Sequence, residues 1–153
     1  MGIFSFFKKK PFFSAKQQEQ IVQAIRLSEK TTSGEIRIFI ESKNPFVNPI
    51  DRASEIFFKL KMQHTEHRNA VLLYVAMMSR EVALFADEGI HKEVGDEYWG
   101  NAVKKMVELF KQDNITKGIE ECVLMIGQTL TEKFPYNSAD DKNELPDDIV
   151  FGK

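Results

Sequence analysis

The stretch Ala70-Val-Leu-Leu-Tyr-Val-Ala-Met-Met78 decides the fold, because it is the longest apolar run in the chain. Its length and composition are typical of a strand that is buried on both faces, and it falls far short of the roughly 20 residues that a membrane-spanning helix requires. A short link around Ser79-Arg80 leads into a second β-rich run, Glu81-Val-Ala-Leu-Phe-Ala86. We therefore predict that residues 71–76 and 81–86 form a β-hairpin.

Before this hairpin, the sequence predicts a helix, a strand and a second helix. Ser14-Ala-Lys-Gln17 has the form of a capping box, and the apolar positions after it share one face of a helix over about residues 14–30. The alternating isoleucines of Ile36-Arg-Ile-Phe-Ile40 indicate a strand with one apolar face. Asn48-Pro49 has the form of a helix start, which predicts a helix over about residues 49–62. The strand, helix and strand make a βαβ unit, so the first two strands should be parallel.

After the hairpin, two amphipathic helices close the predicted order of helix, strand, helix, strand, strand, helix, helix. We expect Asp87 to Glu97 to be a loop, and we expect Asp113 and Asn114 to cap the last helix. The apolar face of the first of these helices carries Trp99, Val103, Met106, Val107 and Phe110, and that of the second carries Ile115, Ile119, Cys122, Val123, Ile126 and Leu130.

One domain, residues 14–135, is expected between two tails. Residues 1–13 are aromatic and basic, and we expect them to be a docked or frayed end or to make peripheral contact with a membrane surface or a partner. The segment from residue 135 onward carries five acidic and two basic residues and few large apolar ones. This composition predicts an acidic, disordered or loosely held tail over residues 136–153.

Composition places the chain among ordinary globular proteins. Its 153 residues include 42% hydrophobic and 29% charged residues with only 8 Gly and 5 Pro, which excludes collagen-like and wholly disordered classes. A formal net charge of −2 argues against a general nucleic-acid binder. The single cysteine excludes zinc fingers and an internal disulfide. The first residues place apolar before basic side chains, the reverse of a signal peptide, so we expect a cytoplasmic, bacterial protein without a transmembrane segment.

Acidic and amide side chains are predicted to gather at one edge of the sheet. The first strand begins at Glu35 and the next one after Asn69, and the parallel arrangement places both starts at the same edge. The hairpin reverses direction, so Asp87 and Glu88 reach that edge too, and the loop after them adds Asp96. Such oxygen atoms are the ligands that Ca²⁺ and Mg²⁺ prefer, although the spacing of an EF-hand is absent. The alternative is a solvated acidic loop.

Other residues that often carry chemistry have simpler explanations here. His64 and His67 share a helical spacing that suits zinc, but they lie in a polar stretch where exposed loop histidines are the simpler interpretation. Cys122 falls on the apolar stripe of the last predicted helix and is expected to pack in the core. The glycine-rich nucleotide motifs and the nucleophile elbow are missing from the sequence.

Several short motifs, taken in order, resemble the TPM domain family, which includes the thylakoid lumen acid phosphatase-like protein and the photosystem II repair protein. They are Thr32-Ser-Gly-Glu-Ile-Arg-Ile38, Arg68-Asn-Ala-Val-Leu-Leu-Tyr-Val-Ala76, Arg80-Glu-Val-Ala-Leu84, Asp87-Glu-Gly-Ile90 and Lys133-Phe-Pro135. The resemblance covers about residues 14–135. It implies a three-layer α/β/α sandwich with a small mixed, Rossmann-like sheet and helices on both faces. It also implies an acidic groove that binds Ca²⁺ or a related ion through Glu35, Asn69, Asp87, Glu88 and Asp96.

Three functions follow from these patterns as expectations. The first is a non-enzymatic regulatory or protein-interaction module that binds Ca²⁺ or Mg²⁺ weakly, with a dissociation constant of about 10⁻⁵ to 10⁻³ M. The second is a metal-assisted acid phosphatase, a phosphomonoesterase in which His91 would be the acid or base and Arg37, Arg68 or Arg80 would hold the phosphate. The third is an interaction protein that captures a protein partner through its two tails. The sequence identifies no catalytic nucleophile.

Overall fold

The computed structural model describes residues 12–45, 48–137 and 145–152, and it has a single mixed sheet. The four strands of the sheet lie in the order β3-β2-β1-β4. β1 is parallel to β2 and β4, and β2 is antiparallel to β3, so the predicted βαβ unit and hairpin are confirmed. In chain order the elements are α2 (Ala15–Glu29), β1 (Glu35–Glu41), α3 (Pro49–Lys59), β2 (Ala70–Ala76), β3 (Glu81–Ala86), α4 (Glu88–Lys111), α5 (Ile115–Lys133) and β4 (Val150–Phe151).

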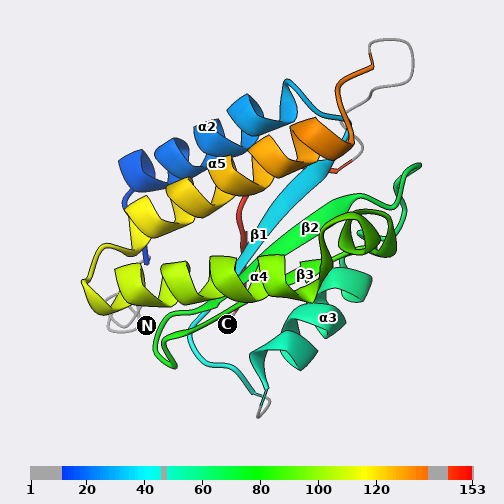
Figure 1. The fold of residues 1–153 in the computed structure, drawn as a ribbon. Coiled ribbons are helices and arrows are strands. Elements are labelled where there is room, and N and C mark those ends of the chain that lie inside the picture. The colour runs from blue at the N-terminus through cyan, green and yellow to red at the C-terminus, as the bar shows by residue number, and fades with distance from the viewer. Residues whose placement is uncertain (1–11, 46–47, 138–144, 153) are drawn as a thin grey trace, which may run out of the picture.

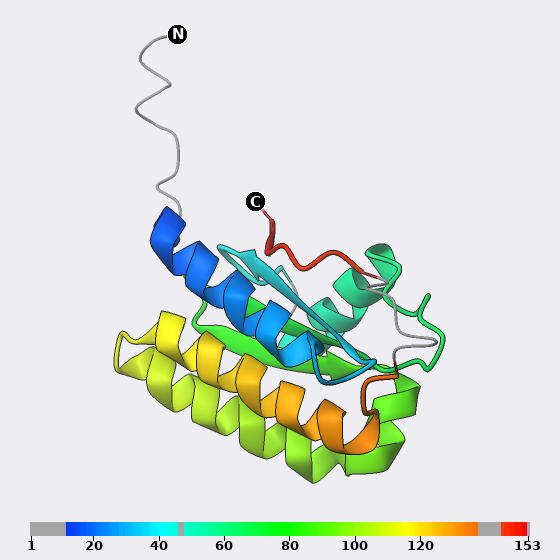
Figure 2. The same cartoon turned by 90° about the horizontal axis from the view of Figure 1, so that it is seen from above.

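Helices cover both faces of the sheet (Figure 1). The isoleucines of β1 pack into a core with α2, α4 and α5, whereas Phe39 of the same strand packs on the other face with Ala53 and Phe57 of α3. Figure 2 shows α4 and α5 side by side on one face of the sheet. Every residue of β2 is buried, as expected for a strand with helices on both sides. The α/β/α sandwich implied by the resemblance is therefore confirmed.

The first two helices begin at the predicted caps. Ser14 Oγ accepts a hydrogen bond from the Gln17 amide at 3.1 Å, and Gln17 Oε1 accepts one from the Ser14 amide at 2.8 Å, which completes the capping box of α2. Asn48 Oδ1 accepts from the Ile50 amide at 3.0 Å at the start of α3. These short-range patterns are readable from sequence because each one is satisfied within a single turn.

Two helix boundaries and one helix cap differ from the predictions. α3 ends at Lys59 rather than near residue 62, because Lys61 adopts a left-handed conformation with φ of 58°. The expected loop from Asp87 to Glu97 is instead the first part of α4, which bends at Gly95, where φ is 78°. Asn114 precedes α5, but its side chain makes no capping hydrogen bond.

Part of the segment expected to form a loosely held tail is attached to the sheet. β4 pairs with Phe39 and Ile40 of β1, and the Gly152 amide donates to the Ile40 carbonyl at 2.7 Å. Leu145 is buried against the α3 side of the sheet. The expectation of a loose segment is wrong for residues 145–152, because a few apolar residues in an acidic sequence are enough to add a short strand to an open sheet edge.

Candidate functional site

The start of β1, the start of β2 and the end of β3 lie together at one end of the sheet, as predicted. The Glu35 amide donates to the Asn69 carbonyl at 3.5 Å, and the Asp87 amide donates to the Ala70 carbonyl at 2.9 Å. The parallel pairing of β1 with β2 and the antiparallel pairing of β2 with β3 fix this arrangement. The start of α4 is therefore held beside the chain that leads into β2.

Gly89 lets the first turn of α4 touch the backbone before β2. Its amide donates to the Arg68 carbonyl at 2.8 Å. A Cβ atom on Gly89 would lie 2.2 Å from the His67 carbonyl oxygen and 2.5 Å from that of Arg68, so any side chain here collides with backbone atoms that cannot rotate away. This close approach brings Arg68 next to the N-terminus of α4.

The Asp87 carboxylate is buried at the start of α4, and both of its oxygens accept hydrogen bonds. Its side chain is 3% exposed and caps α4, with Oδ1 accepting from the Glu88 amide at 2.9 Å. The Arg68 guanidinium donates from Nε to Oδ2 at 2.6 Å and from Nη2 to Oδ1 at 2.8 Å. The hydrogen bond with Asp87 also raises the pKa of Arg68. A buried carboxylate is tolerated here because a two-pronged cation neutralises it.

A groove of about 460 Å³ opens beside this pair, between α3, β3 and α4. Arg68 reaches across it to Glu88, with 3.0 Å between Nη1 and Oε1, and His91 Nε2 lies 3.2 Å from Asp96 Oδ1. Three carboxylates against one arginine give the groove a formal charge of −2 when His91 is neutral. Its polar wall consists of Arg68, Asp87, Glu88, His91 and Asp96, and its apolar wall consists of Ile50, Phe58, Leu84, Phe85, Ala86 and Trp99.

The structure brings together three of the five residues predicted to bind a cation. Asp87, Glu88 and Asp96 line the groove, whereas Glu35 and Asn69 do not. Asn69 is fully buried; its Nδ2 donates to Ser33 Oγ at 3.2 Å, and its Oδ1 has no hydrogen-bond partner in the described structure. Within residues 12–45, 48–137 and 145–152, no set of three or more His, Cys, Asp or Glu side chains is arranged to hold a metal ion.

Glu35 instead belongs to a second acidic cluster, with Glu29 and Asp147. Glu29 Oε2 accepts from the Ile36 amide at 2.8 Å. Burial, a hydrogen bond with Asp147 and the negative charge of Glu35 raise the pKa of Glu29 to about 11. Sequence reasoning missed this cluster because Asp147 lies more than 100 residues from Glu29 in the segment expected to be loose.

The remaining candidates discussed next, two histidines, the cysteine and Arg80, do not line the groove. His64 and His67 are exposed, and Cys122 is buried, so the simpler interpretations of both are confirmed. Burial raises the pKa of the Cys122 thiol to about 12, which leaves no thiolate for nucleophilic chemistry near neutral pH. Arg80 pairs with Asp113 at the other end of the sheet.

Sequence reasoning did not identify the partner of Asp87 or the apolar wall of the groove. The sequence suggests Arg68 as a solubilising surface residue or as an anion-binding one, yet the hairpin register contains the signal for its pairing with Asp87. Val71 pairs with Ala86, so the residues just before β2 must lie opposite those just after β3. Ile50 and Phe58 reach the groove from α3, and no short-range pattern predicts that contact.

Comparison with family models identifies one family for this chain. The sequence model of the TPM domain matches residues 7–129. The NMR structure of the BA42 protein from the psychrophilic bacterium Bizionia argentinensis is 36% identical, with a TM-score of 0.86, and the alignment covers 95% of this chain and 99% of that one. No curated protein matches the chain. In the part of the chain that the structure describes, no helix has the length and apolar character needed to cross a bilayer.

Two more distant structures share the fold. The N-terminal domain of a protein from P. gingivalis is 18% identical with a TM-score of 0.67, and the alignment covers 82% of each chain. The N-terminal domain of the cg2496 protein from Corynebacterium glutamicum is 12% identical with a TM-score of 0.57, covering 88% of this chain and 80% of that one.

Proposed function

The chain belongs to the TPM domain family, and from this premise we propose that it is a regulatory binding domain whose groove at the start of α4 takes up Ca²⁺ or Mg²⁺ weakly. The observation that carries the proposal is the position of Arg68. Its guanidinium bonds to Asp87 and to Glu88 at once, as a cation between two carboxylates would. Asp96 adds a third carboxylate to the same groove.

Arg68 sets both the selectivity and the weakness of this site. Its side chain is 38% exposed, so it is able to swing into solvent, whereas Asp87 is fixed by the helix cap. A divalent cation gains more from carboxylates than a single positive charge does, but it must first displace a two-pronged hydrogen-bonded partner. This competition supports an affinity at the weak end, at about 10⁻⁴ to 10⁻³ M.

Displacing Arg68 would alter the surface around the groove. Arg68 pairs with Asp87 and Glu88 at the start of α4. The helix then bends at Gly95, one residue before Asp96. A cation that pulls Glu88 and Asp96 inward would reorient this first part of α4 beside the apolar wall of Phe58 and Phe85. A protein partner that contacts this wall would then respond to the cation, which is the regulatory role that we propose.

Calorimetric titration with Ca²⁺ and with Mg²⁺ tests the proposal through two substitutions of opposite effect. Asp87→Asn keeps the helix cap but removes the charge, so we expect at least about tenfold weaker binding. Arg68→Gln removes the competing cation and leaves Asp87 buried without a positive partner, so we expect about tenfold tighter binding. The matched control is Asp113→Asn, which removes the same charge from an exposed residue at the other end of the sheet.

Each outcome bears on a separate part of the proposal. Opposite shifts for the two groove variants, with an unchanged control, support a cation site in competition with Arg68. Equal weakening in Asp87→Asn and Asp113→Asn indicates only a general loss of negative charge, and weakening in Arg68→Gln contradicts the competition with Arg68. An absence of binding in the parent chain at about 10 mM cation, roughly ten times the largest dissociation constant in the proposed range, overturns the proposal.

Metal-assisted hydrolysis of a phosphomonoester is the second candidate function. His91 and Arg68 line the same groove, which supports an acid or base and an anion-binding group at one site, whereas Arg80 lies elsewhere. The groove charge of −2 repels a phosphate dianion, so we expect no turnover of p-nitrophenyl phosphate without Ca²⁺ or Mg²⁺. Cation-dependent turnover that is lost in both His91→Gln and Asp87→Asn supports this function. Turnover that persists in Asp87→Asn would contradict it.

A further inference from the structure

The groove at the start of α4 has an apolar wall that plays no part in cation binding. A metal ion needs only the oxygen atoms of the polar wall, whereas six of the eleven lining residues are apolar. Two of these six face solvent, since Phe58 is 46% exposed and Ile50 is 38% exposed. The groove volume of about 460 Å³ is within the range of clefts that hold organic ligands, roughly 300 to 1,000 Å³. The groove therefore has room for more than an ion.

Three phenylalanines fix the shape of this apolar wall before any ligand binds. The ring centroids of Phe57 and Phe58 are 5.3 Å apart, those of Phe57 and Phe85 are 4.8 Å apart, and those of Phe58 and Phe85 are 5.8 Å apart. Phe57 is fully buried, so it holds the other two rings in place. Because ordered aromatic rings lose little conformational entropy when a ligand packs on them, such a wall is suited to anchor a partner.

The polar wall of the groove selects a positively charged group. The side chains of Glu88 and Asp96 are 73% and 96% exposed, so a ligand can reach both, and the formal charge of the groove is −2 when His91 is neutral. This wall already holds one guanidinium, since Arg68 Nη1 lies 3.0 Å from Glu88 Oε1. A second basic group gains from the remaining negative charge without displacing Arg68 from Asp87, whereas an anionic group is repelled.

We propose that the groove binds a protein partner through an extended segment in which a large apolar side chain lies two positions from a lysine or arginine. The apolar side chain packs on Phe58 and Phe85, and the basic one pairs with Glu88 and Asp96. Residues two positions apart in an extended segment point to the same side, about 7 Å from each other, so both enter one groove.

This partner role rests on the proposed cation function for its regulation. Ca²⁺ and the basic side chain need the same two carboxylates, Glu88 and Asp96, so each ligand weakens the binding of the other by the same factor. The partner is therefore held when the cation is scarce and released when the cation is abundant.

Charge and surface composition favour a protein segment over other ligands. Nucleic acid and anionic lipid are repelled by the negative groove. An exposed apolar surface bordered by charged side chains is typical of contacts between proteins. Residues 1–11, the aromatic and basic end for which contact with a membrane or a partner is expected, lie outside the described structure, so the groove is defined by described residues alone.

Amide NMR shifts of the full chain, titrated with a short peptide in EDTA, test the proposal. The probe is a capped pentapeptide with phenylalanine at its second position, arginine at its fourth and glycine elsewhere. We expect shifts at Phe58, Phe85 and Glu88, with a dissociation constant of about 1 mM or below. The same peptide with glutamate in place of arginine should not bind. Equal binding of both peptides overturns the proposal, and so does equally tight binding of 2-phenylethylamine, which would identify a site for small amines.

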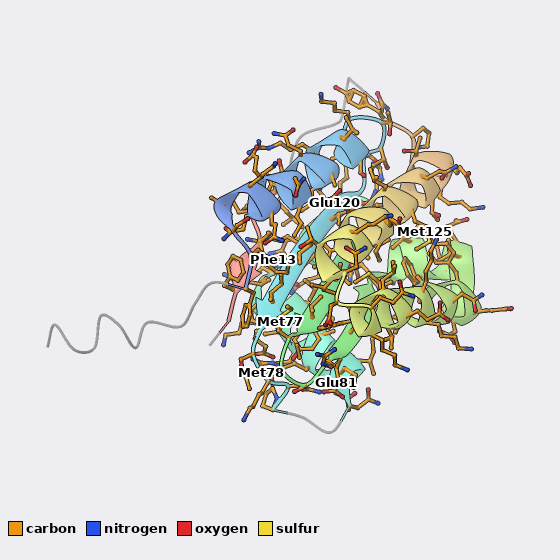
Figure 3. The ribbon with its side chains drawn as sticks, turned by 90° about the vertical axis from the view of Figure 1, so that its left-hand side faces the viewer. Phe13, Met77, Met78, Glu81, Glu120 and Met125 are labelled. Carbon is orange, nitrogen blue, oxygen red and sulfur yellow. The ribbon has the colours of Figure 1, made fainter. Side chains whose placement is uncertain are left out.

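Substitutions on the apolar wall test the first contact. Phe58→Ala should weaken peptide binding about tenfold. Ile50→Ala, which removes a smaller exposed side chain of the same wall, should weaken it about threefold and keeps the test decisive if Phe58→Ala does not fold. The control is Met78→Ala, because Met78 is 67% exposed at the turn between β2 and β3, at the opposite end of the hairpin from Phe85 (Figure 3). Peptide binding that no wall variant changes overturns the proposal.

A double substitution on the polar wall tests the second contact. Glu88→Gln with Asp96→Asn should weaken peptide binding about fivefold, since exposed ion pairs contribute little each. Glu108→Gln with Asp113→Asn removes the same charge from exposed residues at the other end of α4, and should leave peptide binding within about twofold. Equal weakening in the two double variants would contradict a specific contact in the groove.

Titration with Ca²⁺ separates the partner proposal from the proposed function. With the peptide bound, Ca²⁺ at about 10 mM should weaken peptide binding about tenfold, and NaCl of equal ionic strength should not. Phe58→Ala should leave Ca²⁺ binding within about twofold, because a phenylalanine offers no oxygen ligand. A chain that binds Ca²⁺ but not the peptide overturns the partner proposal alone. A chain that binds the peptide but not Ca²⁺ supports the docking site and overturns the proposed function.

Discussion

Gly89→Ala is expected to lower the free energy of unfolding by about 3 kcal/mol or more. The added methyl group would lie 2.2 Å from the His67 carbonyl oxygen and 2.5 Å from the Arg68 carbonyl oxygen. Backbone atoms cannot move aside as a flexible side chain does, so the first turn of α4 must shift away from the chain before β2. That shift also breaks the hydrogen bond from the Gly89 amide to Arg68.

Urea denaturation checks this expectation, with Gly100→Ala as the control on the same helix. A Cβ atom at Gly100 meets no other atom within 4 Å, so alanine there should stabilise the protein by about 0.5 to 1 kcal/mol through helix propensity. A Gly89→Ala variant within about 1 kcal/mol of the parent chain would contradict the close packing on which the groove depends.

Glu29→Gln is expected to stabilise the protein, and to do so more strongly as the pH rises. The pKa of Glu29 is raised to about 11 in the folded chain, against an ordinary value of 4.5. The folded state therefore holds a proton that the unfolded state releases above about pH 4.5, so the contribution of Glu29 to stability is full below that pH and declines as the pH rises toward 11. Glutamine mimics the protonated acid at every pH.

The hydrogen-bond partners of Glu29 also suit the side-chain amide of a glutamine. In the parent chain, the Ile36 amide donates to Glu29 Oε2 at 2.8 Å. The side-chain oxygen of a glutamine accepts the same hydrogen bond, and its amide nitrogen donates to Asp147. We expect a gain of about 2 kcal/mol at pH 8. Urea denaturation at pH 6, 8 and 9.5 measures it, with the exposed Glu108→Gln as control. A variant no more stable than the parent chain at pH 8, with an equal pH dependence, would show that Glu29 is ionised in the fold.

Short-range patterns explain how much of the fold was predictable. The hairpin over residues 70–86 and the caps at Ser14 and Asn48 depend on neighbours in sequence, and all were predicted correctly. The start of α4 was not, because residues 88–98 carry little apolar periodicity. That helix begins where it does because Asp87 caps it and Gly89 allows it to touch the chain before β2. The Gly89 contact depends on tertiary structure, whereas the Asp87 cap is local.

The candidate site, too, was predictable only in part: the strand ends that form it were predicted, and its side-chain contacts were not. Strand direction was enough to bring Asp87 and Asn69 to one edge, since pairing rules fix which ends meet. Strand direction does not specify which way a side chain points. Glu35 therefore lies with Glu29 and Asp147 rather than in the groove, and the carboxylate of Asp87 is bonded to Arg68. The partnership of Glu29 with Asp147 joins elements that are distant in the chain, and no short-range pattern indicates it.

The Nε–H resonance of Arg68 is the most direct test of the central claim, because Nε donates to Asp87 at 2.6 Å. Adding Ca²⁺ or Mg²⁺ to the millimolar range should move or broaden this signal in step with the amides of Glu88 and Asp96, as the cation displaces the guanidinium. The Nε–H signal of Arg52, which is bonded to Glu41 on the α3 side of the sheet, should stay in place as an internal control. An Arg68 signal that remains unchanged throughout the titration would contradict the account.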